Sequence, residues 1–172
     1  MDAIRFHRAP TFREYLEGVE ANRGLWHAVY RKVRLPEDVV RRVREIPARF
    51  RIVALSEDWC GDAVNTLPVV ARLADAAGWD MRVLERDEND DLMSTHLTGE
   101  SSRSIPVVIL YDEDFVEHGW WGPRPRELQE WVLGEGASLP PPERYREVRR
   151  WYARDRGRST LKELLELCAV EV

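Results

Sequence analysis

The sequence contains little cysteine and no long apolar run. Only two of its 172 residues are cysteines, Cys60 and Cys168, and they lie in very different contexts. A stabilising disulfide framework is therefore not indicated, and a reducing compartment fits better. No apolar run approaches the roughly 20 residues that cross a bilayer, and residues 1–10 lack the apolar segment of a signal peptide. These absences predict a soluble, cytoplasmic protein with no membrane partner.

The chain also has no excess of positive charge. Its net charge is −5, and the arginine pairs Arg41-Arg42 and Arg149-Arg150 lie among glutamates, as on solvated helix faces. A nucleic-acid partner is therefore not expected. The four histidines are scattered, and no second cysteine or histidine is spaced as a metal ligand near Cys60. We expect no metal and no cofactor.

The sequence does have enough apolar material for one core. Hydrophobic residues make up 44% of the chain, which is enough for one domain with a sizeable core. The length of 172 residues favours one domain over two. The seven tryptophans are many for this length, and several lie in apolar patterns, which indicates packing in a core or an interface. We predict a single domain over residues 1–172.

A strand, a cysteine and a helix follow one another in the middle of the chain. The apolar run from Ile52 to Leu55 predicts a strand, a polar turn follows, and the pattern from Asp62 to Ala77 predicts a helix that Gly78 ends. Cys60 therefore stands at a helix N-terminus. Unpaired backbone N–H groups and the helix dipole favour a thiolate there, which is one way in which a protein makes a cysteine reactive.

The residues around this cysteine resemble a known family. Trp59-Cys60-Gly61-Asp62-Ala63 resembles the active-site loop of the thioredoxin superfamily, Trp-Cys-Gly-Pro-Cys, with Ala63 in place of the second cysteine. Ile105-Pro106 opens the apolar run at residues 107–111 and matches a second motif of that superfamily. In thioredoxin-like proteins such a pair has a cis peptide bond and faces the active cysteine.

Three stretches are similar to a bacterial subgroup of thioredoxin family proteins: Ser56 to Asp62, Arg86 to Asn89 and Trp121 to Pro125. The whole resemblance covers residues 50–134, and it implies a thioredoxin-like three-layer α/β/α sandwich with a central mixed sheet. The core of this α/β fold is expected at about residues 50–134. Helical extensions are expected on both sides, at residues 11–47 and 141–170.

Apolar spacing predicts the other elements. In the core it predicts a strand at 81–84, a short helix at 92–97, a strand at 116–121 and a helix at 125–133. In the N-terminal extension, Thr11 and Glu14 have the spacing of a capping box, and the pattern after them fits one long helix or two helices broken near Gly24. The last helix is expected to begin near Thr160, with Glu163 completing its cap.

The absent second cysteine narrows the chemistry that the resemblance implies. A dithiol oxidoreductase uses its second cysteine to resolve the mixed disulfide that the first one forms, and Ala63 cannot do so. Ala54 stands where the superfamily often has a buried aspartate. Cys60 alone can form a mixed disulfide and release it to an external thiol such as glutathione. The Asp62 carboxylate would oppose a thiolate, so the direction of the Cys60 pKa stays open.

The candidate catalytic residue is Cys60, and the candidate substrate-binding residues around it are Trp59, Gly61, Asp62, Ile105 and Pro106. Gly61 would let a small thiol or a substrate backbone come close. Trp59 would offer an aromatic flank, with core packing as its alternative role. The backbone of Ile105 would pair with an extended substrate segment.

Two functions from different classes stay open. The first is single-cysteine thiol-disulfide exchange with a protein or a low-molecular-weight thiol. The second is a redox-inactive thioredoxin-fold module that binds a protein partner. Thiol reactivity at Cys60 separates them.

Cys168 lies on the apolar stripe of the last helix, which indicates a small core residue, against the alternative of a distant resolving thiol. The sequence does not reveal the oligomeric state.

Overall fold

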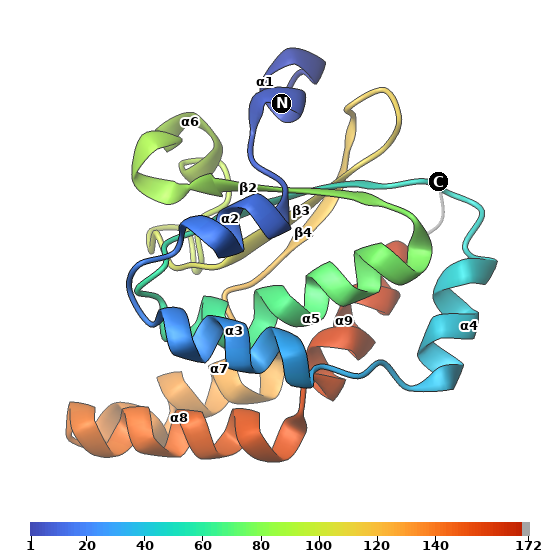
Figure 1. The fold of residues 1–172 in the computed structure, drawn as a ribbon. Helices are drawn as coiled ribbons and strands as arrows, with labels where there is room; N and C mark the ends of the chain where they lie inside the picture. Colours follow the sequence, from blue (N-terminus) through green and yellow to red (C-terminus); the bar gives the residue numbers. More distant parts are fainter. Residues whose placement is uncertain (170–172) are drawn as a thin grey trace.

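A four-stranded mixed sheet forms the centre of the computed structural model, which describes residues 1–169 (Figure 1). The strand order is β2-β1-β3-β4. β1 (Arg51–Ser56) runs parallel to β2 (Asp80–Glu85), whereas β3 (Val107–Tyr111) is antiparallel to both β1 and β4 (Glu117–Trp121). All four strands that the sequence predicts are therefore present, and their pairing confirms the mixed sheet.

The two central strands carry the apolar runs because they are covered on both faces. Every residue of β3 and every residue of β1 after Arg51 is buried. Ala54 of β1 lies between Val83 of β2 and Val108 of β3 and is fully buried. A nearly continuous apolar run is typical of a strand in this position. The loop that carries the cysteine follows directly after the carboxyl end of β1.

Helices lie on both sides of the sheet, which confirms the predicted thioredoxin-like sandwich (Figure 1). α5 (Gly61–Ala77) connects β1 to β2 and shares one side with α9 (Arg158–Cys168), whereas α1 (Ala3–Arg8) lies on the other side. α5 ends at Gly78, whose φ of +72° is the left-handed conformation that glycine adopts most readily.

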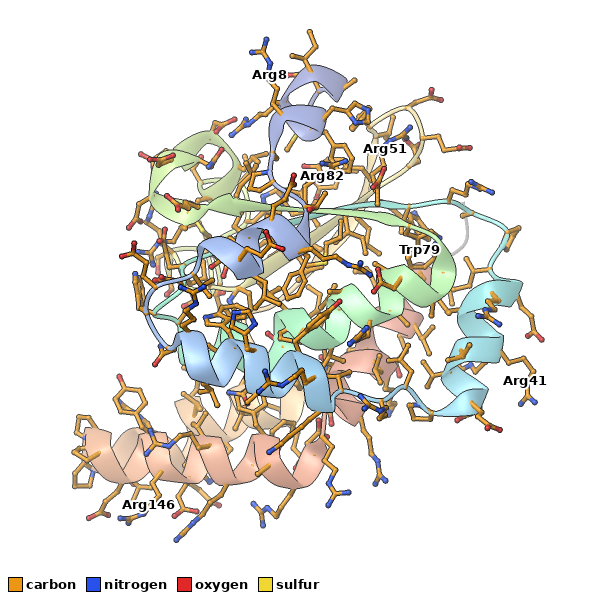
Figure 2. The ribbon with its side chains drawn as sticks, viewed as in Figure 1. Arg8, Arg41, Arg51, Trp79, Arg82 and Arg146 are labelled. Atoms are coloured by element: carbon orange, nitrogen blue, oxygen red, sulfur yellow. The ribbon has the colours of Figure 1, made fainter. Side chains whose placement is uncertain are left out.

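α1 is an element that the apolar spacing of the sequence does not predict. The Asp2 side chain caps this six-residue helix by accepting the backbone N–H of Arg5 at 2.9 Å, and Phe6 is fully buried beneath it. Figure 2 shows Arg82 between α1 and β2, where its guanidinium lies 5.4 Å from the Phe6 ring and donates to the carbonyl of Ala9 at 3.2 Å. A helix this short has too few residues for a periodic apolar pattern.

Three helices separate α1 from β1. They are α2 (Phe12–Gly18), α3 (Arg23–Lys32) and α4 (Glu37–Glu45), of which α2 contacts β2 and the other two contact α5. The predicted capping box of Thr11 and Glu14 is present at the start of α2. The alternative of one long helix is wrong. The break lies at residues 19–22, earlier than Gly24, and ends at Asn22, which has a left-handed φ of +55°.

The connection between β2 and β3 differs from its prediction. It contains a 3₁₀ turn, η1 (Arg86–Glu88), and the four-residue α6 (Asp90–Met93) in place of a helix at 92–97. The side-chain hydroxyls of Ser94 and Thr95 donate to the carbonyls of Asp91 and Leu92. Such local hydrogen bonds compete with helix continuation, and α6 ends at Met93.

The chain after the sheet is helical, as predicted. α7 (Arg126–Leu133) and the 3₁₀ turn η2 (Glu135–Ser138) precede α8 (Pro141–Asp155), and left-handed residues Arg156 and Gly157 separate α8 from α9. Residue 170, the last of the expected C-terminal extension, lies outside the described residues. Within residues 1–169, no helix is long and apolar enough to cross a bilayer.

The expected start of α9 near Thr160 is wrong. The helix begins at Arg158 after the N-cap residue Gly157, and the Asp155 carboxylate accepts the backbone N–H of Ser159 in its first turn at 3.2 Å. Glu163 has a different role, because its carboxylate accepts the indole N–H of Trp121 at 2.7 Å and the backbone N–H of Arg126 at 2.8 Å. It therefore ties α9 to β4 and to the start of α7.

Candidate functional site

Cys60 lies at the junction between β1 and α5. It is the N-cap residue of α5 and is only 7% exposed. Its thiol donates to the carbonyl oxygen of Ile105, which lies 3.4 Å from Sγ. Ile105 is also buried and precedes Pro106 at the entrance of β3. The two sequence motifs, 45 positions apart, therefore meet at this thiol.

Burial is the main influence on the Cys60 thiol. Burial raises the pKa of this group, and the negative charge of Asp62 raises it further. The backbone N–H groups of Ala63 and Asp62 and the positive charge of Arg124 act in the opposite direction, because they stabilise a thiolate. The net shift of the Cys60 pKa is upward. The direction that the sequence left open is thus resolved, and the resting thiol is protonated at neutral pH.

The wall beside Cys60 is formed by the close approach of two loops. The Ile105-Pro106 peptide bond is cis. A Cβ atom on Gly122, which follows β4, would lie 2.1 Å from the carbonyl oxygen of Pro106. Gly122 also has a φ of +139°, which L side chains rarely adopt. Glycine at this position therefore lets the chain pass Pro106 on its way to Arg124.

Asp62 does not point freely toward solvent. Its side chain is 12% exposed, and Arg124 Nη2 lies 2.6 Å from its Oδ2. The hydroxyl of Tyr152 on α8 donates to Oδ1 at 2.9 Å. Burial and the nearby Asp62 charge both raise the pKa of Tyr152 far above its usual range, so this hydroxyl keeps its proton. The carboxylate is therefore held by two donors from the C-terminal half of the chain.

Trp59 and Gly61 form the open side of the site. Trp59 is 53% exposed, so core packing does not account for it, and the guanidinium carbon of Arg86 lies 5.4 Å from its ring centre. No heavy atom lies within 4 Å of the place where a Cβ on Gly61 would stand, once its chain neighbours and its own helix backbone are left aside. A substrate that reaches Cys60 can therefore approach over these two residues.

The N-terminal helices hold the loop before Cys60. The carboxylate of Asp58 accepts the backbone N–H groups of Glu20 and Ala21 at 2.9 and 2.8 Å, in the break between α2 and α3. The fully buried Trp26 donates its indole N–H to the carbonyl of Asp58 at 2.8 Å. The side-chain amide of Asn22 donates to the carbonyl of Trp59. The extension before β1 is therefore part of the scaffold of the site.

Cys168 belongs to the opposite end of the sheet. The carbonyl of its neighbour Leu167 lies 3.1 Å from the His118 ring, which in turn lies 4.9 Å from the Phe50 ring, just before β1. Cys60 follows the other end of β1, whose six residues span about 17 Å. A disulfide needs Cα atoms within about 7 Å. Burial also raises the pKa of Cys168 to about 12, so Cys168 acts as a core residue.

The groups that hold the site carry no clear signal in the sequence. Arg124 lies within the Trp121 to Pro125 stretch, which was noted only as a resemblance, and Tyr152 was one of several aromatic residues at helical spacing. Asp58 gave no signal of its own. Within residues 1–169, no group of three or more His, Cys, Asp and Glu side chains is arranged to hold a metal ion.

Comparisons with known proteins agree with this fold. A family model described as Thioredoxin matches residues 9–146, a range that includes α2, α3 and α4 as well as the sheet. A crystal structure of an HIV epitope scaffold superimposes with a TM-score of 0.77 at 17% identity, covering 99% of this chain and 98% of that one. A protein of unknown function from Pseudomonas aeruginosa gives 0.75 at 20% identity, with 97% of each chain covered. No curated protein matches.

Proposed function

The chain belongs to the thioredoxin family, whose model matches residues 9–146, and on this premise we propose that Cys60 carries out single-thiol disulfide exchange. The Cys60 thiolate attacks one sulfur of a protein or low-molecular-weight disulfide. A mixed disulfide forms, and the other half of the substrate leaves as a thiolate that takes up a proton. An external thiolate, such as that of glutathione in a reducing cytoplasm, then attacks the substrate's sulfur in the mixed disulfide. A new disulfide forms between the external thiol and the substrate half, and Cys60 leaves as a thiolate.

The observation that carries this proposal is the position of the Cys60 sulfur. It lies at the N-terminus of α5, within reach of the backbone N–H groups of Asp62 and Ala63, and next to the Ile105 carbonyl. These N–H groups have no carbonyl acceptor within the helix, because they belong to its first turn, and they stabilise a thiolate. The arrangement supports attack by Cys60 and leaves release to an outside thiol, because Ala63 carries no sulfur.

The exchange is slow at neutral pH, since only thiolate attacks and burial raises the Cys60 pKa. A raised pKa means that the thiolate fraction, and with it the rate, increases as pH rises from 7 toward the pKa. The substrate approaches over Trp59 and Gly61, and its extended backbone lies along Ile105 and Pro106. Asp62 contributes through its charge, since Arg124 and Tyr152 already occupy its carboxylate.

One observation favours a second function. Cys60 is 7% exposed and its pKa is raised, as expected for a thiol that takes no part in chemistry. The exposed Trp59 would then serve only to bind a protein partner. In this second proposal the loop is a docking surface of a redox-inactive thioredoxin-fold module.

A chromogenic aromatic disulfide separates the two functions. Attack by Cys60 releases a coloured thiolate, and its rate is followed from about pH 6.5 to 9.5 for the wild type, Cys60→Ser and Cys168→Ala. Exchange predicts that Cys168→Ala keeps the rate and its rise with pH, whereas Cys60→Ser loses both. If Cys60→Ser releases colour as fast as the wild type, or the folded wild type releases none, the exchange proposal is wrong and the binding module is preferred.

A further inference from the structure

Three parts of the chain meet at the Asp62 carboxylate. Asp62 belongs to the first turn of α5, Arg124 to the loop between β4 and α7, and Tyr152 to α8. The Asp62 and Arg124 side chains are only 12% and 21% exposed, so their 2.6 Å ion pair is poorly screened by water. Arg124 Nη1 also donates to Gln129 Oε1 of α7 at 2.8 Å, which fixes the guanidinium.

This cluster bears directly on the neighbouring thiol. Asp62 and Arg124 are the charged side chains that act on the pKa of Cys60, and a negative charge on Cys60 in turn raises the pKa of Arg86 and of Tyr152. Asp62 is two residues from Cys60, and a free carboxylate there would disfavour a second negative charge on Sγ. The positive charge of Arg124 offsets the charge of the Asp62 carboxylate, and the hydrogen bond from the Tyr152 hydroxyl stabilises that carboxylate further.

We propose that Arg124 and Tyr152 are positioning residues that hold the Asp62 carboxylate and offset its charge at Cys60. This inference rests on the proposed exchange function, because it concerns the same thiol. Its consequence is that α8, which lies outside the core expected from the sequence, adjusts the reactivity of Cys60. The close passage of Gly122 by Pro106 places Arg124 for this role, and Gln129 keeps it there.

Substitutions in the cluster should change Cys60 in opposite directions. Arg124→Gln removes the cation and leaves the Asp62 charge uncompensated, so fewer thiolates form. Asp62→Asn removes the anion and leaves Arg124, so more thiolates form. Each change should move the midpoint of Cys60 alkylation by about one pH unit, or about tenfold in rate at a fixed pH below the midpoint. Tyr152→Phe should act like Arg124→Gln but more weakly.

The experiment measures the pH dependence of alkylation by iodoacetamide, a neutral reagent, on full-length protein that carries Cys168→Ala. Intact-mass spectrometry reads the modification, and circular dichroism confirms that each variant is folded. Arg124→Lys is the matched control, because it keeps the charge and should lie closer to the wild type than Arg124→Gln. The expected order of midpoints, from low to high pH, is Asp62→Asn, wild type, Arg124→Gln.

The opposite signs distinguish positioning from a merely structural role. A loosened fold would speed alkylation at every pH in both variants. The inference is overturned if Arg124→Gln and Asp62→Asn move the midpoint in the same direction, or if neither moves it. Because alkylation does not depend on disulfide exchange, the two proposals fail separately. Shifted midpoints without release from the chromogenic disulfide would reject exchange, and release with unshifted midpoints would reject the positioning role.

Discussion

Replacing Gly122 with alanine should damage the wall of the site that faces Cys60. The new Cβ would lie 2.1 Å from the carbonyl oxygen of Pro106 and 3.3 Å from Cα of Val107. Ordinary van der Waals contacts begin near 3.4 Å, so Gly122 and Pro106 must separate by about 1 Å or more. Both neighbours are main-chain atoms, which cannot rotate away as a flexible side chain can.

Two costs add at this position. A non-glycine residue at a φ of +139° carries about 1–3 kcal/mol of backbone strain, and forcing extra volume into a packed site costs about 1–3 kcal/mol. We expect Gly122→Ala to lower the free energy of unfolding by about 3 kcal/mol. The shift of Pro106 should also move the adjacent Ile105 carbonyl away from Sγ, and so expose the thiol.

Gly61→Ala is the matched control. Gly61 has open space around its Cβ position and no positive φ, and it begins α5, where alanine is a better helix former. Its free energy of unfolding should change by less than about 1 kcal/mol. Urea denaturation measures both variants, and iodoacetamide alkylation at a fixed pH measures thiol exposure. If Gly122→Ala unfolds at the same urea concentration as Gly61→Ala, and its Cys60 is alkylated no faster than that of the wild type, the predicted clash with Pro106 is refuted.

Three further predictions concern Asp58, which supports the site, Cys168 in α9, and the ion pair of Arg5 in α1 with Asp91. Asp58→Ala removes the acceptor for two backbone N–H groups, so it should lower the free energy of unfolding by about 1–3 kcal/mol in urea denaturation; a change below 0.5 kcal/mol would contradict this. Cys168→Ala should leave the rate of exchange at Cys60 unchanged and cost about 1 kcal/mol of stability; a loss of exchange would show that Cys168 takes part. Arg5 lowers the pKa of Asp91 to about 2. The ion pair should therefore contribute its full stability to the folded state above pH about 4, and this contribution should be lost as pH falls through 2. Because the pair is exposed, the loss is small and should appear as faster amide exchange in α1, and Asp91→Asn should abolish that pH dependence.

The core of the fold could be predicted because its signals are local. The apolar run of β1, the helical pattern of α5 and the stop at Gly78 each follow from a few adjacent residues. The family resemblance supplied the order of these elements. Boundaries were less certain where side chains compete with the backbone, as at Ser94 and Thr95 after α6. The start of α9 was misplaced because Glu163 bonds to β4 and α7 and not to its own helix.

The candidate site was only partly predictable from the sequence. Cys60 and Ile105 could be paired because both carry family motifs. The ion pair of Asp62 with Arg124 could not, since the two residues are far apart in the sequence and charged residues are common on surfaces. The upward shift of the Cys60 pKa also depends on burial, which comes from the packing of the whole domain. A local sequence pattern does not predict how deeply the thiol is buried.

Single-thiol exchange requires that Cys60 both forms a mixed disulfide and releases it. Full-length protein carrying Cys168→Ala is incubated with oxidised glutathione at a series of pH values, and intact-mass spectrometry measures the adduct, with Cys60→Ser as control. We expect one glutathionyl group on Cys60, formed faster as pH rises above 7 and removed by reduced glutathione. No adduct at any pH, or an adduct that excess reduced glutathione leaves in place, would contradict single-thiol exchange.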